Sequence, residues 1–181
     1  MLLKGGAWVP LALLLGLLGH RAPPARAQSI DEYQAKAAFL FNFAKFVDWP
    51  STVFKNEKDP IRICVLGQNP FGASLDDAVR GRDVAGRPLI AIQVSDLRQA
   101  EGCQIIFVAA SERKRFKPMA AGLSAANVLT VGEVEGFVSE GGIVNFKVED
   151  GRIRFEINLA AADQAKVRIS SKLLSLARVV K

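Results

Sequence analysis

The chain has 181 residues and a formal net charge of +6, which is a length that suits one domain with a substantial core. The positive charge is spread along the chain, and the longest basic run is Arg113-Lys114-Arg115. We therefore do not expect nucleic-acid binding.

The first 27 residues have the pattern of a secretory signal peptide. Lys4 supplies a positive start, residues 8–18 form an apolar run, and Ala25-Arg26-Ala27 is a small-residue cleavage site. We predict cleavage after Ala27, which leaves an exported, soluble domain at 28–181. The alternative is an uncleaved segment that tethers the protein to a membrane.

Cleavage would change the available chemistry. The sole histidine, His20, would leave with the signal peptide, and the loss of Lys4, Arg21 and Arg26 would lower the net charge from +6 to +3. A chain without imidazole has no Ser-His-Asp or Cys-His catalysis and no histidine metal site. We therefore expect no enzyme, no metal and no cofactor.

The first mature element is predicted to be a helix at 31–47, which ends before Pro50. It carries two apolar stripes where a surface helix normally has one. One stripe is Tyr33, Ala37, Leu40, Ala44 and Val47; the second is Phe39, Phe43 and Phe46, and Lys36 lies between them. The second stripe faces either a partner or second copy, or the interior of the same domain.

Short apolar runs then alternate with helical segments. Strands are expected at 61–66, 89–94, 103–109 and 128–131, and helices at 71–79, 95–100 and 111–123. This alternation predicts a single Rossmann-like α/β domain with a mainly parallel twisted sheet flanked by helices. The glycines do not form G-x-G-x-x-G, so no dinucleotide site is expected.

The two cysteines, Cys64 and Cys103, are expected to form a disulfide, which is the default for such a pair in an exported protein. Each lies near the beginning of an apolar strand. If these strands are parallel neighbours, both cysteines lie at one end of the sheet, as a disulfide requires.

The clearest local structure is a hairpin. Asp150-Gly151 separates alternating runs at 143–149 and 152–158, which predicts a two-residue type I′ turn and fixes the register. The apolar face pairs Val144 with Ile157, Phe146 with Phe155 and Val148 with Ile153. The polar face pairs Asn145 with Glu156, Lys147 with Arg154 and Glu149 with Arg152. Lys147 and Arg154 should repel, and Glu149 and Glu156 lie diagonally where they offset this repulsion.

The candidate ligand-binding residues lie on this polar face and just after it. They are Glu156, Asn158, Arg168 and Ser170, the last two preceding a predicted helix at 171–179. Arginine can bind a carboxylate or phosphate with two hydrogen bonds, and a helix start favours an anion. The alternative is that Glu156 pairs with Arg168 and that Ser170 only caps the helix. Glu133 and Glu135 also follow a strand, where α/β ligand sites gather, but catalysis there is not favoured.

The segment DEYQAKAAFLFNFAKFVDWP resembles the start of the YfiR-like family, exported proteins of Gram-negative bacteria that are also catalogued as a domain of unknown function. Later stretches agree in order and spacing. They are ICVLG at 63–67, GRPL at 86–89, VLTVG at 128–132, GGIVNF at 141–146, RFEINL at 154–159 and RISSKLL at 168–174.

This resemblance implies a periplasmic regulator that represses an inner-membrane diguanylate cyclase and thereby controls cyclic di-GMP signalling and biofilm formation. The partner would be the periplasmic domain of that cyclase, or of a sensor kinase, and the Phe39, Phe43 and Phe46 stripe is the expected partner or homodimer surface. The alternative function is a periplasmic sensor or carrier for a small ligand. Some family members have a second cysteine pair, which this chain lacks.

Overall fold

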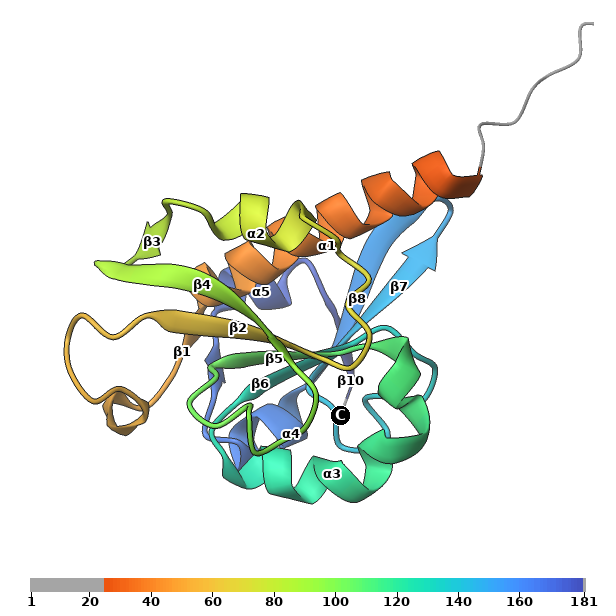
Figure 1. Ribbon diagram of the computed structural model, residues 1–181. Coiled ribbons are helices and arrows are strands. Elements are labelled where there is room, and N and C mark those ends of the chain that lie inside the picture. The colour runs from red at the N-terminus through yellow and green to blue at the C-terminus, as the bar shows by residue number, and fades with distance from the viewer. Residues whose placement is uncertain (1–24, 181) are drawn as a thin grey trace, which may run out of the picture.

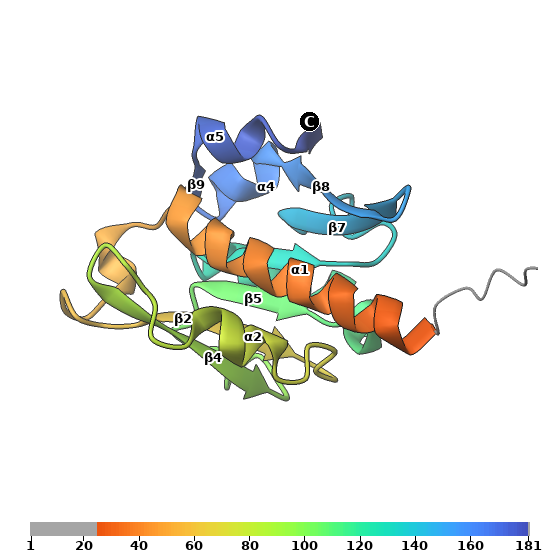
Figure 2. The ribbon, with the colours of Figure 1, turned by 90° about the horizontal axis from the view of Figure 1, so that it is seen from above.

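The computed structural model describes residues 25–180, with side chains from residue 32 onward. A twisted sheet lies between two helical layers (Figure 1). Helices α1 (Ala25–Phe46) and α2 (Ser74–Val79) cover one face, and α3 (Arg113–Ala125) covers the other, with α4 (Leu159–Gln164) beside it. Seen from above, α1 crosses the sheet between α2 and the C-terminal hairpin (Figure 2).

Within the described residues the main sheet has eight strands, in the order β10-β8-β7-β6-β5-β2-β4-β3. Strands β4, β2, β5, β6 and β7 run parallel, and β3 and β8 are antiparallel to their neighbours β4 and β7. The expected Rossmann-like α/β class is therefore confirmed. The strands are β2 (Ile61–Leu66), β3 (Asp83–Val84), β4 (Arg87–Val94), β5 (Ile105–Val108), β6 (Leu129–Gly132), β7 (Val144–Glu149), β8 (Arg152–Asn158) and β10 (Arg178–Val180).

The central strands are apolar along their whole length because both faces are covered. In β2, Ile63 and Val65 pack in the core under α1, whereas Cys64 and Leu66 pack in a second core with Phe116 of α3. Side chains that alternate along one strand thus fill both layers.

The disulfide is confirmed. Cys64 lies in β2, Cys103 lies just before the neighbouring parallel strand β5, and the two Cα atoms are 6.0 Å apart. Both residues are buried, so the bond lies inside the core between the sheet and α3.

The C-terminal helix expected at 171–179 is wrong in length. Helix α5 spans Ser171–Leu174, and residues 178–180 form β10, which pairs in parallel with Glu156–Asn158 of β8. The free hydrogen-bonding edge of β8 outweighs the local helical pattern, because an unpaired edge strand offers a row of open N–H and C=O groups.

Other boundaries also differ from the sequence expectation. Helix α1 is already formed at Ala25, where the described residues begin, six residues before the expected start at 31. Residues 95–100 form turns instead of a helix, and β3 was not expected. A small second sheet pairs β1 (Val47–Asp48) with β9 (Arg168–Ile169). Most of the predicted signal peptide lies outside the described residues.

Candidate functional site

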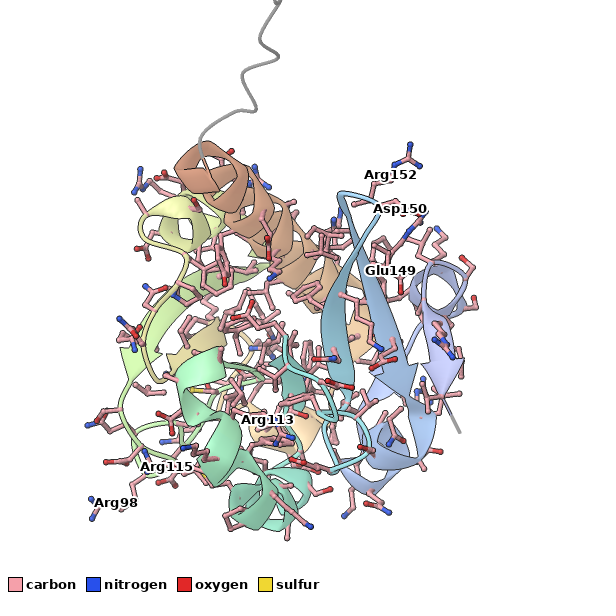
Figure 3. All side chains as sticks on the ribbon, turned by 90° about the vertical axis from the view of Figure 1, so that its right-hand side faces the viewer. Arg98, Arg113, Arg115, Glu149, Asp150 and Arg152 are labelled. Carbon is pink, nitrogen blue, oxygen red and sulfur yellow. A yellow bond between two sulfur atoms is a disulfide. The ribbon has the colours of Figure 1, made fainter. Side chains whose placement is uncertain are left out.

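The hairpin of β7 and β8 has the predicted register at all six residue pairs. Asp150 and Gly151 have φ values of 51° and 69°, as a type I′ turn requires. Figure 3 shows this turn at one extremity of the molecule, with Glu149 and Arg152 on either side of it. The local turn chemistry therefore fixes which side chains face α1 and which form the polar face.

The apolar face of the hairpin packs on the second aromatic stripe of α1. The Phe43 ring lies 5.7 Å from that of Phe146 and 5.3 Å from that of Phe155, and Phe43 is fully buried. Phe39 contacts the same two rings, while Phe39 and Phe46 keep part of their surface exposed. Phe43 thus belongs to the core of this chain and not to its surface. A partner or dimer surface here stays a prediction that concerns the exposed parts of Phe39 and Phe46.

A buried ion cluster joins α1 to the loop after β6. Lys36 is only 3% exposed, and its Nζ lies 2.6 Å from Glu133 Oε2 and 2.5 Å from Glu32 Oε1. The Tyr33 hydroxyl donates a hydrogen bond to the Glu133 carboxylate, with its oxygen 3.2 Å from both Oε1 and Oε2. Burial, and then the negative charge of Glu133, raise the pKa of Tyr33 well above its ordinary value.

Sequence reasoning missed this cluster. The sequence places Glu133 after a strand and Lys36 between the two stripes of a helix. No local sequence pattern indicates that these residues, which are 97 positions apart, form an ion pair. A lysine inside a largely apolar helix face was the available signal, because a buried lysine requires an acidic partner.

Tight packing around Phe137 holds the loop that carries Glu133. The Phe137 ring stacks on Phe116 at 4.1 Å and passes between Gly132 and Gly142. A Cβ added to Gly142 would lie 2.2 Å from this ring, so only glycine fits there. Arg113 of α3 donates two hydrogen bonds, of 2.7 and 2.9 Å, to the carboxylate of Glu140. They fix the C-terminal part of the loop to α3.

A cavity of about 530 Å³ lies beside this cluster, at the carboxyl ends of β5 and β6. Ligands bind preferentially at this end of a parallel sheet. The polar residues that line it are Glu32, Tyr33, Lys36, Glu133, Glu135, Asn145, Lys147 and Glu149.

The crossover point of the sheet, between β2 and β5, is closed instead. Gly67 has a φ of 94°, and a Cβ there would lie 2.5 Å from Ser111 Oγ and 2.7 Å from Glu112 Cγ. Ser111 also accepts a hydrogen bond from the backbone N–H of Gln68 at 2.9 Å. The open space at the carboxyl ends of the strands is therefore displaced toward β6 and β7.

The polar face of the hairpin contains a second buried group of side chains. Lys147 Nζ lies 3.0 Å from Glu156 Oε2, and Asn145 Nδ2 donates to Glu156 Oε1 at 3.5 Å. Lys147 lies opposite Arg154, and Glu156 offsets this repulsion as expected, whereas Glu149 forms no ion pair among the described residues. Asn145 Oδ1 is buried and has no hydrogen-bond partner among residues 32–180.

The four predicted ligand-binding residues lie in different surroundings. Asn158 caps α4, because its Oδ1 accepts from the N–H of Ala161 at 2.9 Å, and Ser170 caps α5. Arg168 is exposed, and its Nη2 lies 4.0 Å from Asp48.

A cavity of about 310 Å³ is lined by Arg168 and Ser170 but not by Glu156. The structure therefore brings Arg168 and Ser170 together and places Glu156 at another cavity beside Lys147. The ion pair considered between Glu156 and Arg168 is replaced by pairs with Lys147 and Asp48. Ligand binding by these residues remains a prediction.

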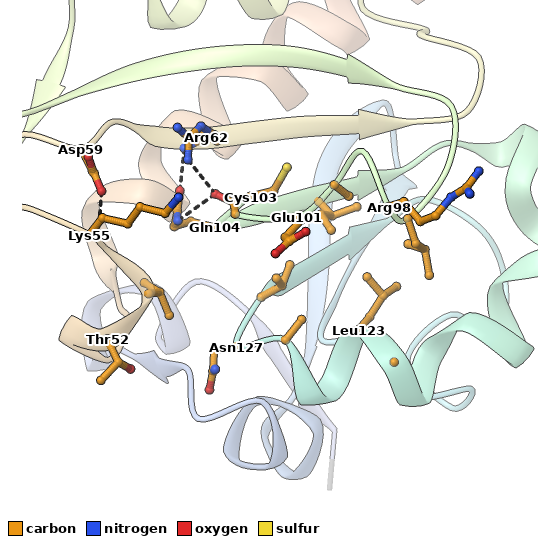
Figure 4. A pocket seen from close by; sticks show the side chains of 18 residues that line it. Thr52, Lys55, Asp59, Arg62, Arg98, Glu101, Cys103, Gln104, Leu123 and Asn127 are labelled. Atoms are coloured by element: carbon orange, nitrogen blue, oxygen red, sulfur yellow. Dashed lines mark hydrogen bonds between the residues drawn. The ribbon is translucent and has the colours of Figure 1, made fainter.

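Another cavity, of about 1040 Å³, lies at the amino ends of the strands beside the disulfide (Figure 4). Arg62 and Gln104 in its lining are engaged in structural contacts. Arg62 donates to the carbonyl oxygen of Gly102 at 3.3 Å, and the backbone N–H of Arg62 donates to Gln104 Oε1 at 2.8 Å. Across the part of the chain that the structure describes, no three His, Cys, Asp or Glu residues gather as a metal site would require.

Residues 33–178 match the protein family described as YfiR/HmsC-like, and this match covers most of the chain. The chain belongs to the YfiR/HmsC-like family. Its family is periplasmic and regulatory and acts on diguanylate cyclases. Among the helices of this YfiR/HmsC-like chain that the structure describes, none has the length and apolar character needed to cross a membrane.

Two solved structures align with parts of this YfiR/HmsC-like chain, and the first of them is similar in fold. A conserved domain protein from Vibrio cholerae has a TM-score of 0.54 at 15% identity, over 80% of this chain and 60% of the other. The ABC domain in complex with L-Trp from Streptococcus pneumonia has a TM-score of 0.48 at 11% identity, over 66% of this chain and 55% of the other. The chain thus spans less than two thirds of either structure. No curated protein matches it significantly.

Proposed function

We propose that this chain is a periplasmic regulator that binds the periplasmic domain of an inner-membrane diguanylate cyclase and represses it. The observation that carries the proposal is the family match over residues 33–178. Repression would lower cyclic di-GMP in the cell and limit biofilm formation.

The geometry of the candidate site supports a protein that acts by binding a partner rather than by catalysis. The side chain of Glu133 is 7% exposed at the carboxyl ends of the strands, and it is held by the ammonium of Lys36 and the hydroxyl of Tyr33. The oxygens of this carboxylate are engaged by these two partners, and a group held in this way serves a structural role. The ion cluster therefore holds α1 against the loop after β6.

The decisive experiment is deletion of the gene in its own bacterium, followed by measurement of cyclic di-GMP. We expect the level to rise and to return when the wild-type chain is supplied. An unchanged level after deletion would count against repression. Capture of the tagged protein from the native envelope should recover a membrane diguanylate cyclase. Recovery of a sensor kinase instead would assign the other partner class.

Export and cleavage of the predicted signal peptide can be tested separately. The protein recovered from the periplasm should begin at Gln28, which mass spectrometry of the intact chain can determine. A chain that keeps residues 1–27 and stays in the membrane fraction would support the tethered alternative.

A small-ligand sensor is the second candidate function. The cavity at the carboxyl ends of β5 and β6 favours it, because polar side chains from α1, from the loop after β6 and from β7 line it together with Phe146.

A further inference from the structure

The cavity beside the disulfide has an apolar floor. It lies between the C-terminal part of α3, the turns before β5 and the loop before β2 (Figure 4), and its volume of about 1040 Å³ is comparable with the largest small-molecule sites. The side chains of the floor are buried or half-buried, and they are Leu97, Ala100, Cys103, Ile106, Leu123 and Val128. An apolar surface of this kind favours contact with an apolar part of a ligand.

Two cations lie at one end of this floor. Lys55 and Arg62 both line the cavity, and Figure 4 shows them at the same end, away from Leu123. Among the described residues, neither cation forms an ion pair. Within residues 32–180 the Arg62 guanidinium donates one hydrogen bond, to the carbonyl oxygen of Gly102, so most of its N–H donors are available to a ligand.

The acids of the lining are not paired with these cations. The Asp59 carboxylate accepts hydrogen bonds from two backbone N–H groups of its own loop, at 2.6 and 3.2 Å, and so holds that loop in shape. Glu101 is exposed and lies toward Arg98, away from Lys55 (Figure 4). The end of the cavity that carries Lys55 and Arg62 therefore favours an anion.

We propose that this cavity binds an aliphatic carboxylate. The carboxylate group lies between Lys55 and Arg62, since a guanidinium can bind such a group with two hydrogen bonds. The alkyl chain extends from there over the apolar floor toward Leu123. This site goes beyond the proposed function, because contact with a membrane partner does not require a ligand at this end of the strands.

The test is calorimetric titration of the purified protein with octanoate. Butanoate keeps the charge but has a shorter chain, and 1-octanol keeps the chain but has no charge. We expect saturable binding of octanoate, with butanoate bound about tenfold or more weakly because less apolar surface is buried. Binding of 1-octanol should be several-fold weaker, because hydrogen bonds to a charged group are stronger than those to a neutral one. Absence of saturable octanoate binding, or equal binding of either control, would overturn the proposal.

Charge variants locate the carboxylate. Lys55→Met changes an exposed side chain, so it should leave the fold intact and weaken octanoate binding several-fold. Arg62→Gln should weaken it by about tenfold, because the guanidinium donors are lost. Lys58→Met is the matched control, since Lys58 is exposed in the same loop but does not line the cavity. An equal loss for Lys55→Met and Lys58→Met would indicate general charge attraction and would refute a specific site.

A change of shape tests the apolar floor without a change of charge. Ala126 lines the cavity and is exposed at the end of α3, so Ala126→Phe should fill part of the space and weaken octanoate binding about tenfold or more. Ala121→Phe makes the same change at an exposed position of α3 outside the lining, and should leave binding unchanged. Undiminished binding by Ala126→Phe would refute this position of the alkyl chain.

The outcome is independent of the proposed function. Octanoate binding is measured on the isolated protein, so it can fail while deletion still raises cyclic di-GMP, and the reverse combination is equally distinguishable.

Discussion

Lys36 Nζ and Glu133 Oε2 lie 2.6 Å apart, although 97 residues separate them in the sequence. Their side chains are 4% and 7% exposed. This contact fixes the middle of α1 to the loop at the carboxyl end of β6, and both residues line the cavity there.

Replacement of Lys36 by methionine should destabilise the protein strongly. Glu133 would lose its cation while remaining buried, and breaking a buried pair in this way costs about 3 kcal/mol or more. Urea unfolding monitored by circular dichroism measures the change. The double variant Lys36→Met/Glu133→Gln should recover more than half of the loss, because it leaves no unpaired buried charge there. Lys45→Met, at an exposed position of α1, is the control and should change stability by less than about 0.5 kcal/mol. A loss of the same small size for Lys36→Met would contradict the buried-pair argument.

Tyr33 is the sole tyrosine of the chain, so its ionisation can be followed by absorbance. Burial and the charge of Glu133 raise its pKa, and the absorbance change of the folded protein should therefore have its midpoint well above the ordinary value of 10.0. Glu133→Gln should move the midpoint back toward that value. A wild-type midpoint near the ordinary pKa would show that Glu133 does not hold the phenol in its protonated form.

The same shift predicts a loss of stability in alkali. The folded pKa of Tyr33 is raised, so its contribution to the free energy of unfolding is fully present below the unfolded pKa of about 10 and is lost as pH rises above it. The slope is at most about 1.4 kcal/mol per pH unit, and partial exposure of Tyr33 reduces it. Urea unfolding at pH 9 to 11 (roughly one unit either side of the reference pKa) measures the slope. Tyr33→Phe should lose stability less steeply, and parallel curves would exclude this contribution.

Removal of the disulfide should lower stability by about 4 kcal/mol, the chain-entropy value for the 39-residue separation of Cys64 and Cys103. The double variant Cys64→Ala/Cys103→Ala tests this by urea unfolding. Wild-type protein unfolded in a strong reductant should approach the variant, whereas the variant itself should be insensitive to the reductant. Identical wild-type curves with and without reductant would mean that the bond contributes nothing to stability.

Gly142→Ala should destabilise the protein by about 2 kcal/mol or more, because the new methyl group overlaps the Phe137 ring and its backbone carbonyl. Gly122→Ala is the matched control. Gly122 lies inside α3 with open space around its Cα, so alanine there should stabilise by about 0.5–1 kcal/mol. Thermal unfolding distinguishes the two. Equal behaviour of both variants would contradict the close packing around Phe137.

We expect the exposed parts of Phe39 and Phe46 to form the contact with the membrane partner. Phe46→Ser should abolish capture of the membrane partner and raise cyclic di-GMP as deletion does, with the fold checked by circular dichroism. Leu176→Ser is the control, because Leu176 is 66% exposed and lies between α5 and the edge strand β10. If Leu176→Ser releases the partner and Phe46→Ser does not, the contact lies at the C-terminal edge instead of on α1.

The sequence by itself determined the features that depend on neighbouring residues. Asp150-Gly151 permits the positive φ values of a type I′ turn, and a turn of fixed length sets every cross-strand pair of the hairpin. The alternation of apolar runs and helices likewise predicted a mainly parallel sheet. Such a sheet brought Cys64 and Cys103 to one end.

Only the tertiary structure decided the contacts between distant segments. Phe43 is fully buried because the apolar face of the hairpin lies against α1, and a helical wheel cannot tell such a neighbour from a partner protein. Residues 178–180 form a strand because the edge of β8 is open to them. Glu156 and Arg168 lie at different cavities, while Lys36 and Glu133 meet. Local periodicity determines which side chains must be buried, but the packing of whole elements determines which of them meet, and here that packing built the candidate site.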